Sequence, residues 1–155
     1  MKADEVTRYL RETFDGVRVA EGGGDTFLLY DPDGDLPPER QIPFATLVTG
    51  DHYDSVSDLD RRGAYRLNIG LTRSGYVALF GATPIRPGAD GVFDTGFDYT
   101  ATDTVLPHPT YAGQHWVCVV DPGEATWDTV RELLAEAYGF AVRKHVNRQT
   151  RQSAS

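Results

Sequence analysis

The segment LPHPTYAGQHWVCVVDPGEATWDTVRELLAEAYGFAV, residues 106–142, decides the fold. Residues 115–120 are apolar after the first residue and predict a buried strand. The Asp-Pro-Gly sequence at residues 121–123 then turns the chain. Apolar residues recur at helical spacing after the turn and predict an amphipathic helix over residues 126–145. A strand and a helix joined by a tight turn must share one core.

Shorter predicted elements precede this segment. Asp4 stands before a helical apolar pattern and is the expected N-cap of a first helix. The glycine-rich stretch EGGGD separates two β-rich runs, which predicts a hairpin. The predicted elements are helices over residues 4–14 and 72–80 and strands over residues 17–20, 26–30, 44–49 and 64–71.

Two segments are too rich in breaking residues for regular structure. Residues 31–43 hold four prolines, which remove donors from a sheet ladder. Residues 82–97 mix proline, glycine and aspartate without periodicity, and we expect a long surface excursion that serves as a lid. Residues 99–105 are expected to be extended. The predicted class is therefore α+β, with two layers: a mainly antiparallel sheet packed against N- and C-terminal helices.

Composition and length predict one domain. The 155 residues are 40% hydrophobic, which suits a single continuous core. We expect residues 1–146 to form one α+β domain and residues 147–155 to be a disordered basic tail. The single cysteine, Cys118, excludes an intrachain disulfide and is expected to be buried.

Charge and hydropathy bear on partners. The net charge is −8. After the last acid, Glu136, come four cations, Arg143, Lys144, Arg148 and Arg151, so residues 1–142 carry −12. An acidic surface repels phosphate backbones, which makes nucleic acid an unlikely partner in our interpretation. The sequence has no apolar stretch of membrane-spanning length and no signal-peptide pattern at its start, so we expect no membrane contact and a cytoplasmic location.

Three stretches carry a family resemblance: PFATLVTGDHYDSVSDLDRRGAYRLNIG, LPHPTYAGQHWVCVVDP and LLAEAYGFAVRKH. They resemble an uncharacterised actinobacterial family, the domain-of-unknown-function 6194 proteins, over most of the chain. The His-Trp pair, the apolar strand, the proline turn and the helix that follow it are similar, more remotely, to YjbR/MmcQ-like proteins. That second resemblance implies a two-layer α+β fold. The YjbR/MmcQ-like family has been linked by its fold to DNA binding, and DNA binding suits this acidic chain poorly. Fold resemblance alone does not supply a function.

Arg66 and Asn68 are the first candidates for a site. In the strand AYRLNIG, alternation places both on one face, opposite three apolar residues. A guanidinium beside an amide suits a carboxylate or carbonyl ligand. The alternative is a solvated outer face on which Arg66 pairs with Asp58 or Asp60.

His108, His115 and Trp116 complete the expected site. His108 lies between two prolines, and His115 enters the predicted strand beside Trp116. We expect these three residues to converge with Arg66 and Asn68 in a polar cleft on the sheet face. Alternatively, each histidine only satisfies local hydrogen bonds.

Asp51, Asp54, Asp58 and Asp60 gather near His52 in one loop. Oxygen-rich loops bind hard cations, but this spacing lacks the ligand alternation and the glycine of an EF-hand. Aspartates also bind their own loop backbone, which is the commoner reason for such clusters. We therefore assign no metal and no cofactor.

Three functions fit these residues. We favour a small-molecule binding domain that uses the polar cleft. The alternatives are a YjbR-like module that binds protein or nucleic acid and a metal-dependent hydrolase that uses Asp51, Asp54 and the histidines. Whether the chain is an enzyme, and its oligomeric state, are left open.

Overall fold

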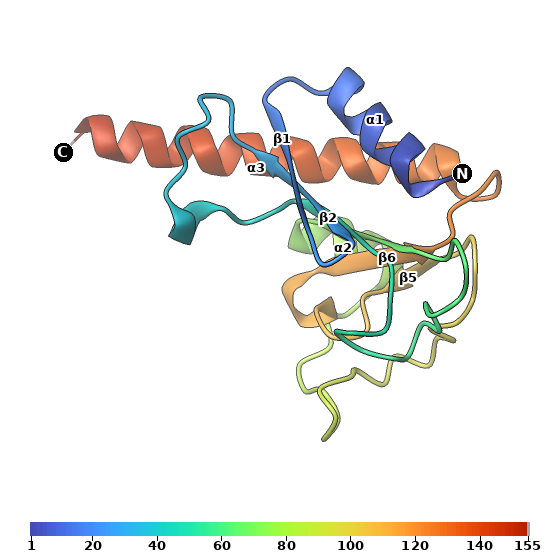
Figure 1. Ribbon diagram of the computed structural model, residues 1–155. Coiled ribbons are helices and arrows are strands. Elements are labelled where there is room, and N and C mark those ends of the chain that lie inside the picture. Colours follow the sequence, from blue (N-terminus) through green and yellow to red (C-terminus); the bar gives the residue numbers. More distant parts are fainter. Residues whose placement is uncertain (155) are drawn as a thin grey trace.

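The computed structural model describes residues 1–154, and of Ala154 only the backbone. Within that range it contains three α-helices and one six-stranded sheet (Figure 1). The elements in chain order are α1 (Ala3–Thr13), β1 (Val17–Gly22), β2 (Asp25–Tyr30), η1 (Pro38–Arg40), β3 (Ala45–Val48), β4 (Arg66–Gly70), α2 (Arg73–Phe80), β5 (Val105–Pro107), η2 (Ala112–Gln114), β6 (Trp116–Val120) and α3 (Trp127–Ala154).

The sheet has the order β1-β2-β3-β4-β6-β5, and each neighbouring pair of strands is antiparallel. β3 and β4 form its centre, and β4 pairs with β6 with Asn68 opposite Cys118 and Gly70 opposite Trp116. The predicted α+β class with an antiparallel sheet and terminal helices is confirmed. The predicted hairpin is also present, as β1 and β2.

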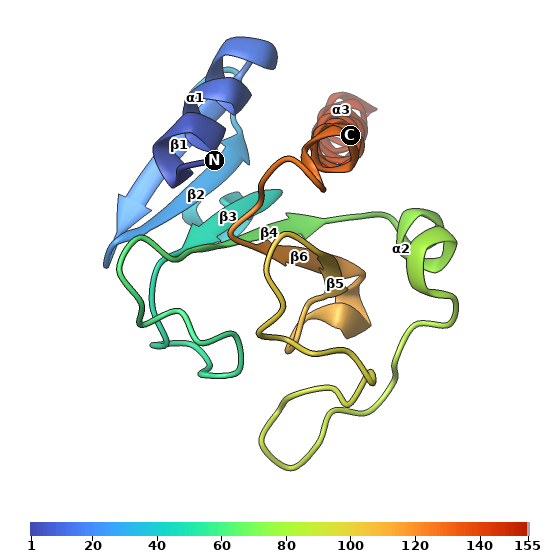
Figure 2. The same cartoon turned by 90° about the vertical axis from the view of Figure 1, so that its right-hand side faces the viewer.

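Helices cover only one face of the sheet. Figure 2 shows α1 and α3 above the strands and the long loops below them. Side chains of alternate strand residues point up into the core beneath the helices, because neighbouring residues of a strand face opposite ways. The buried strand residues of this core include Leu28, Leu47, Leu67, Ile69, Val117 and Val119, which pack with Val130 and Leu134 of α3.

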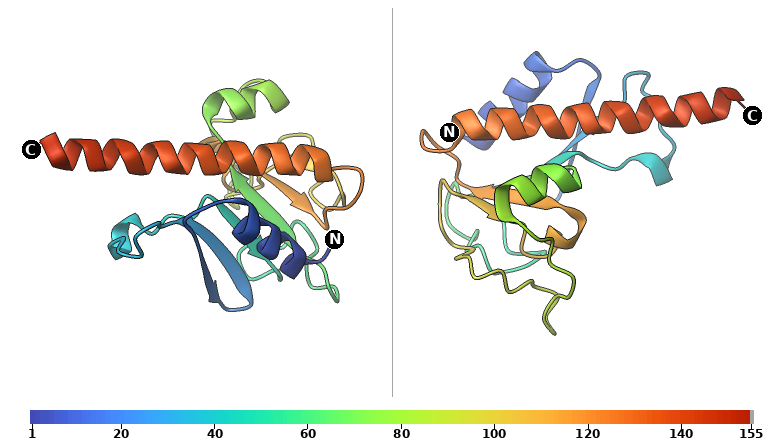
Figure 3. Two further views of the ribbon diagram at one scale, coloured as in Figure 1. Left: turned by 90° about the horizontal axis from the view of Figure 1, so that it is seen from above. Right: turned by 180° about the vertical axis from the view of Figure 1, so that it is seen from behind.

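α3 is longer than the sequence predicts. The helix continues to Ala154, so residues 147–154 are helical where a disordered tail is expected. These residues include no proline or glycine, and Arg and Gln have good helix propensity, so the hydrogen-bond ladder has no reason to stop at residue 145. Figure 3 shows this end of α3 projecting past the sheet.

Three local predictions are corrected. α1 begins after Lys2, so Asp4 lies in its first turn and is not its N-cap. His115 lies outside β6 in the left-handed conformation with φ of 73°. Most of residues 99–104 form turns, and the extended segment is Val105–Pro107.

Within residues 1–154, no helix combines the length and apolar character that crossing a membrane requires.

Candidate functional site

The sheet face away from α1 and α3 contains a hollow of about 600 Å³, hereafter the sheet-face hollow. Loop residues on either side of the central strands enclose it. Its lining residues are Phe27, Ile42, Pro43, Thr46, Val48, Tyr53, Asp54, Arg66, Asn68, Gly91, His108, Thr110, Tyr111 and Trp116. It therefore joins four consecutive strands of the sheet, β2, β3, β4 and β6, with loops that are far apart in the sequence.

Arg66 is a buried ion-pair partner at the floor of the hollow. Its side chain is 2% exposed, and Nη1 and Nη2 donate to the two carboxylate oxygens of Asp54 at 3.1 and 2.9 Å. Nη1 also donates to Ser57 Oγ at 2.9 Å, and Nε donates to Asn68 Oδ1 at 3.0 Å. The protein thus uses four of its five N–H groups. The alternative of a solvated Arg66 paired with Asp58 or Asp60 is wrong.

Asn68 continues this network across the sheet. A guanidinium can only donate, so the bond from Arg66 fixes the amide with Oδ1 towards that side chain. Nδ2 then donates to Thr46 Oγ1 of the neighbouring strand at 3.0 Å. The second N–H of Nδ2 has no acceptor among the described residues. Asn68 consequently links β4 to β3 through a side-chain hydrogen bond and also leaves one N–H group available to donate in the hollow.

His108 is the most distinctive group of the hollow. It is 2% exposed, and its Nδ1 accepts hydrogen bonds from the backbone N–H groups of Thr110 and Tyr111 at 3.1 and 3.0 Å. Nδ1 therefore carries no proton, and the proton of the neutral ring is on Nε2. No acceptor for Nε2 is found within residues 1–154. Burial, and then the positive charge of Arg66, hold the pKa of His108 well below its usual value.

Trp116 forms one wall, and a glycine makes room for it. The two residues Gly70 and Trp116 are direct cross-strand partners. A Cβ at position 70 would come within 2.8 Å of the indole atoms Cε2 and Cζ2. The indole therefore lies flat over the backbone of β4, an approach that only glycine allows.

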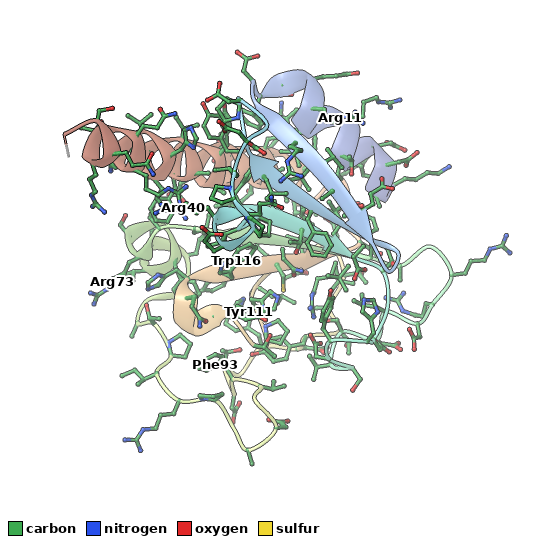
Figure 4. All side chains as sticks on the ribbon, turned by 60° about the vertical axis from the view of Figure 1, so that its left-hand side comes forward. Arg11, Arg40, Arg73, Phe93, Tyr111 and Trp116 are labelled. Atoms are coloured by element: carbon green, nitrogen blue, oxygen red, sulfur yellow. The ribbon has the colours of Figure 1, made fainter. Side chains whose placement is uncertain are left out.

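The rim is apolar and aromatic. Ile42, Tyr53 and Tyr111 are 66, 63 and 56% exposed, although large apolar side chains usually avoid water. Figure 4 shows Tyr111 and Trp116 on the loop side of the sheet, below α3. Exposed rings around a polar floor are a common arrangement in small-molecule sites.

Four of the five predicted site residues line this hollow: Arg66, Asn68, His108 and Trp116. His115 does not, which corrects the expected convergence. It lines a separate cavity of about 870 Å³ beside α2, where its ring lies 6.1 Å from that of Tyr76. The left-handed turn that ends η2 directs His115 away from Trp116.

Tyr53 and Tyr111 line the hollow although the sequence did not mark them as site residues, and Asp54 has a place in this cleft that the sequence did not suggest. Two of these are aromatic residues in otherwise polar loops, which was an available signal. Of the predicted lid, residues 82–97, Gly91 alone reaches the hollow. The partner of Arg66 could not be chosen among four nearby aspartates from spacing alone.

The acidic loop around Asp51 folds on its own backbone. Asp51 Oδ1 accepts from the N–H of Leu59 at 2.9 Å, and Asp60 Oδ1 accepts from the N–H of Asp51 at 3.1 Å. His52 Nε2 lies 2.5 Å from the buried carboxylate of Asp25. Among residues 1–154, no three His, Cys, Asp or Glu side chains are placed to hold a metal ion.

Fold and site together define an α+β protein whose sheet is covered by helices on one face and carries a polar-floored, aromatic-rimmed hollow on the other. The model of a family of unknown function (DUF6194) matches residues 1–150, and the chain belongs to this family. Searches of curated proteins and of solved structures each find no match.

Proposed function

We propose that the protein is a small-molecule binding domain and that the sheet-face hollow is its binding site. The observation that carries this proposal is His108, which lines the hollow with Nδ1 held by the loop backbone and with Nε2 left without an acceptor among the described residues. Among the described residues, the fully buried side-chain atoms that lack a partner do not include this Nε2, so water can reach it, and a ligand that accepts from it in place of water contributes about 0.5–1.5 kcal/mol. The volume of about 600 Å³ lies within the usual range for such sites.

The charge of the floor suits an uncharged ligand. Arg66 and Asp54 neutralise each other, so the network does not require a counter-ion. The exposed rings of Tyr53 and Tyr111 add apolar area at the entrance. Covering that area on binding contributes about 25 cal/mol per Å².

Trp116 makes the proposal testable by fluorescence. The other tryptophan, Trp127, contacts Tyr9 on the helix side with ring centroids 5.0 Å apart, so Trp127→Phe leaves Trp116 as the only indole. We expect members of a set of small aromatic carbonyl, carboxyl and amine compounds to change Trp116 emission with saturation. Tryptophan emission follows the environment of the indole, which a bound ring would alter.

Two histidine variants provide the matched control. His108→Asn keeps an oxygen near the position of Nδ1 for the loop amides but removes the Nε2 donor. His115→Asn makes the same change outside the hollow, at a left-handed position that asparagine tolerates. We expect His108→Asn alone to weaken binding. Equal weakening by both variants, or a set in which no compound alters the emission, contradicts the proposal.

We also propose, on the sequence arguments above, that the chain is a single domain of actinobacterial origin located in the cytoplasm. The relationship to YjbR/MmcQ-like proteins, the absence of a nucleic-acid partner and the absence of a bound metal or cofactor likewise stay predictions. Neither the interaction module nor the metal-dependent hydrolase is favoured by a specific observation, and we do not propose either of them.

A further inference from the structure

At the floor of the sheet-face hollow, three N–H groups of the described residues lack an acceptor. One N–H of Arg66 Nη2, one N–H of Asn68 Nδ2 and the Nε2–H of His108 have no acceptor within residues 1–154. All three residues are at most 3% exposed and line the same hollow. A ligand that satisfies them must therefore present acceptor oxygens or nitrogens.

Electrostatics disfavour a negatively charged acceptor. The guanidinium of Arg66 is already held by both oxygens of Asp54, so its positive charge is balanced inside the protein. The surrounding body, residues 1–142, carries −12. A carboxylate ligand would lose its hydration without meeting an unbalanced cation, which is costly, whereas a neutral carbonyl would not.

The walls favour a flat ring. Trp116 lies over the backbone of β4 at Gly70, while Tyr53 and Tyr111 stand exposed at the rim. Aromatic side chains contact other rings through stacked or edge-on arrangements that add about 0.5–1.5 kcal/mol beyond area burial. Exposed rings around one hollow indicate a partner whose own surface is aromatic.

We propose that the sheet-face hollow binds an uncharged aromatic molecule that carries a carbonyl group, with the carbonyl oxygen accepting from His108 Nε2 and the ring contacting Trp116. This inference rests on the proposed function, because it names the ligand class of the same site. It replaces the carboxylate-or-carbonyl expectation from the sequence with the carbonyl alone.

Three probes that share one ring test the class: benzamide, benzoate and benzylamine, which are neutral, anionic and cationic at pH 7.5. Each is titrated into the full-length Trp127→Phe protein while Trp116 emission is recorded. We expect benzamide to bind at least about tenfold more tightly than benzoate, a difference of about 1.4 kcal/mol. We expect His108→Asn to weaken benzamide binding by about fivefold or more and His115→Asn to leave it unchanged.

The outcomes separate the two proposals. Saturable binding in which benzoate or benzylamine equals or exceeds benzamide overturns the ligand class but leaves a small-molecule site. Benzamide binding that His108→Asn does not weaken, in a variant that still unfolds cooperatively, also overturns the class, because the carbonyl then does not use this donor. Emission unaffected by all three probes and by the wider compound set overturns the proposed function itself.

Discussion

His108 is distinguished by the different roles of its two ring nitrogens. Nδ1 holds the backbone of Thr110 and Tyr111, and Nε2 faces the ligand proposed for the hollow. Since Nδ1 accepts two hydrogen bonds, protonation of the ring would break the loop anchor as well as bury a charge next to Arg66. The low pKa of His108, caused by burial and by Arg66, follows from this position.

The first prediction concerns stability against pH. A histidine whose pKa is lowered on folding stabilises the protein fully above its unfolded pKa of about 6.5, and that contribution is lost as the pH falls below it. We expect the difference in free energy of unfolding between the wild type and His108→Asn to shrink by about 1–2 kcal/mol from pH 6.5 to pH 5. Urea unfolding of both proteins at each pH measures it. A difference that stays constant or grows contradicts a neutral, buried His108.

The second prediction concerns Cys118, whose thiol donates to the carbonyl of Pro107 at 3.7 Å. Burial raises the pKa of Cys118 from 9.0 to about 12. Only the thiolate attacks thiol reagents, so at pH 8 we expect folded protein to react about a thousandfold more slowly than unfolded protein. Absorbance with a disulfide reagent, with and without urea, gives both rates. Comparable rates would place the thiol in contact with solvent.

At the scale of elements, the loop of residues 50–64 is fastened to β4 through a single side chain. Arg66 binds Asp54 and Ser57 of this loop, which also carries Tyr53 of the rim. The loop has no regular secondary structure, so this fastening replaces the hydrogen-bond ladder that would hold a strand. The position of Tyr53 therefore depends on this ion pair together with the contact of the preceding residue, His52, with Asp25 of β2.

A third prediction follows from this fastening. Asp54→Ala leaves the guanidinium of Arg66 buried without its counter-charge, and we expect a loss of about 3–5 kcal/mol in the free energy of unfolding. Arg131→Ala breaks the exposed pair with Asp128 in α3 and should cost less than about 1 kcal/mol. Chemical denaturation compares the two variants. Similar small losses in both would show that the Arg66–Asp54 pair contributes little to stability.

The contact between β4 and β6 gives the fourth prediction. Gly70→Ala places a methyl group 2.8 Å from the indole of Trp116, and we expect a loss of about 1–3 kcal/mol together with a shift in Trp116 emission. Gly22→Ala in β1 meets no atom within 4 Å and serves as the control, with stability unchanged or slightly raised. If both variants keep wild-type emission and stability, the indole does not lie over position 70.

At the scale of the whole molecule, the helix-side core and the sheet-face hollow lie on opposite faces of one sheet. The apolar residues of the strands pack under α1 and α3, while the polar residues between them face the loops. Each central strand therefore contributes to both layers: Leu67 and Ile69 to the core, Arg66 and Asn68 to the hollow. Changes in the hollow are predicted to alter binding through residues that the helix-side core does not use.

This division explains what the sequence could predict. Alternation in β4 correctly separated Arg66 and Asn68 from the apolar residues, and the run predicted as a buried strand over residues 115–120 forms β6, Trp116–Val120. Period-two and helical patterns are local, so they can be read from neighbouring residues. The same locality explains why Arg66 and Asn68, predicted to share one face of the strand, both line the hollow.

Other features depend on contacts that no local pattern encodes. The left-handed conformation of His115 starts β6 one residue later than predicted, and the choice of Asp54 for Arg66 depends on how a loop of irregular conformation crosses the sheet. The sequence prediction ends α3 at residue 145 because the following residues are polar, although these residues have good helix propensity. Loop conformation and the helix end were thus the two sources of error.

The most direct test is the position of a bound molecule. Crystals of the full-length protein soaked in benzamide should show the ring in the sheet-face hollow against Trp116, with its oxygen about 3 Å from His108 Nε2. Benzamide found only in the cavity beside His115 would contradict the proposed binding site. A hollow that holds only solvent, under conditions that saturate binding in solution, would contradict it as well.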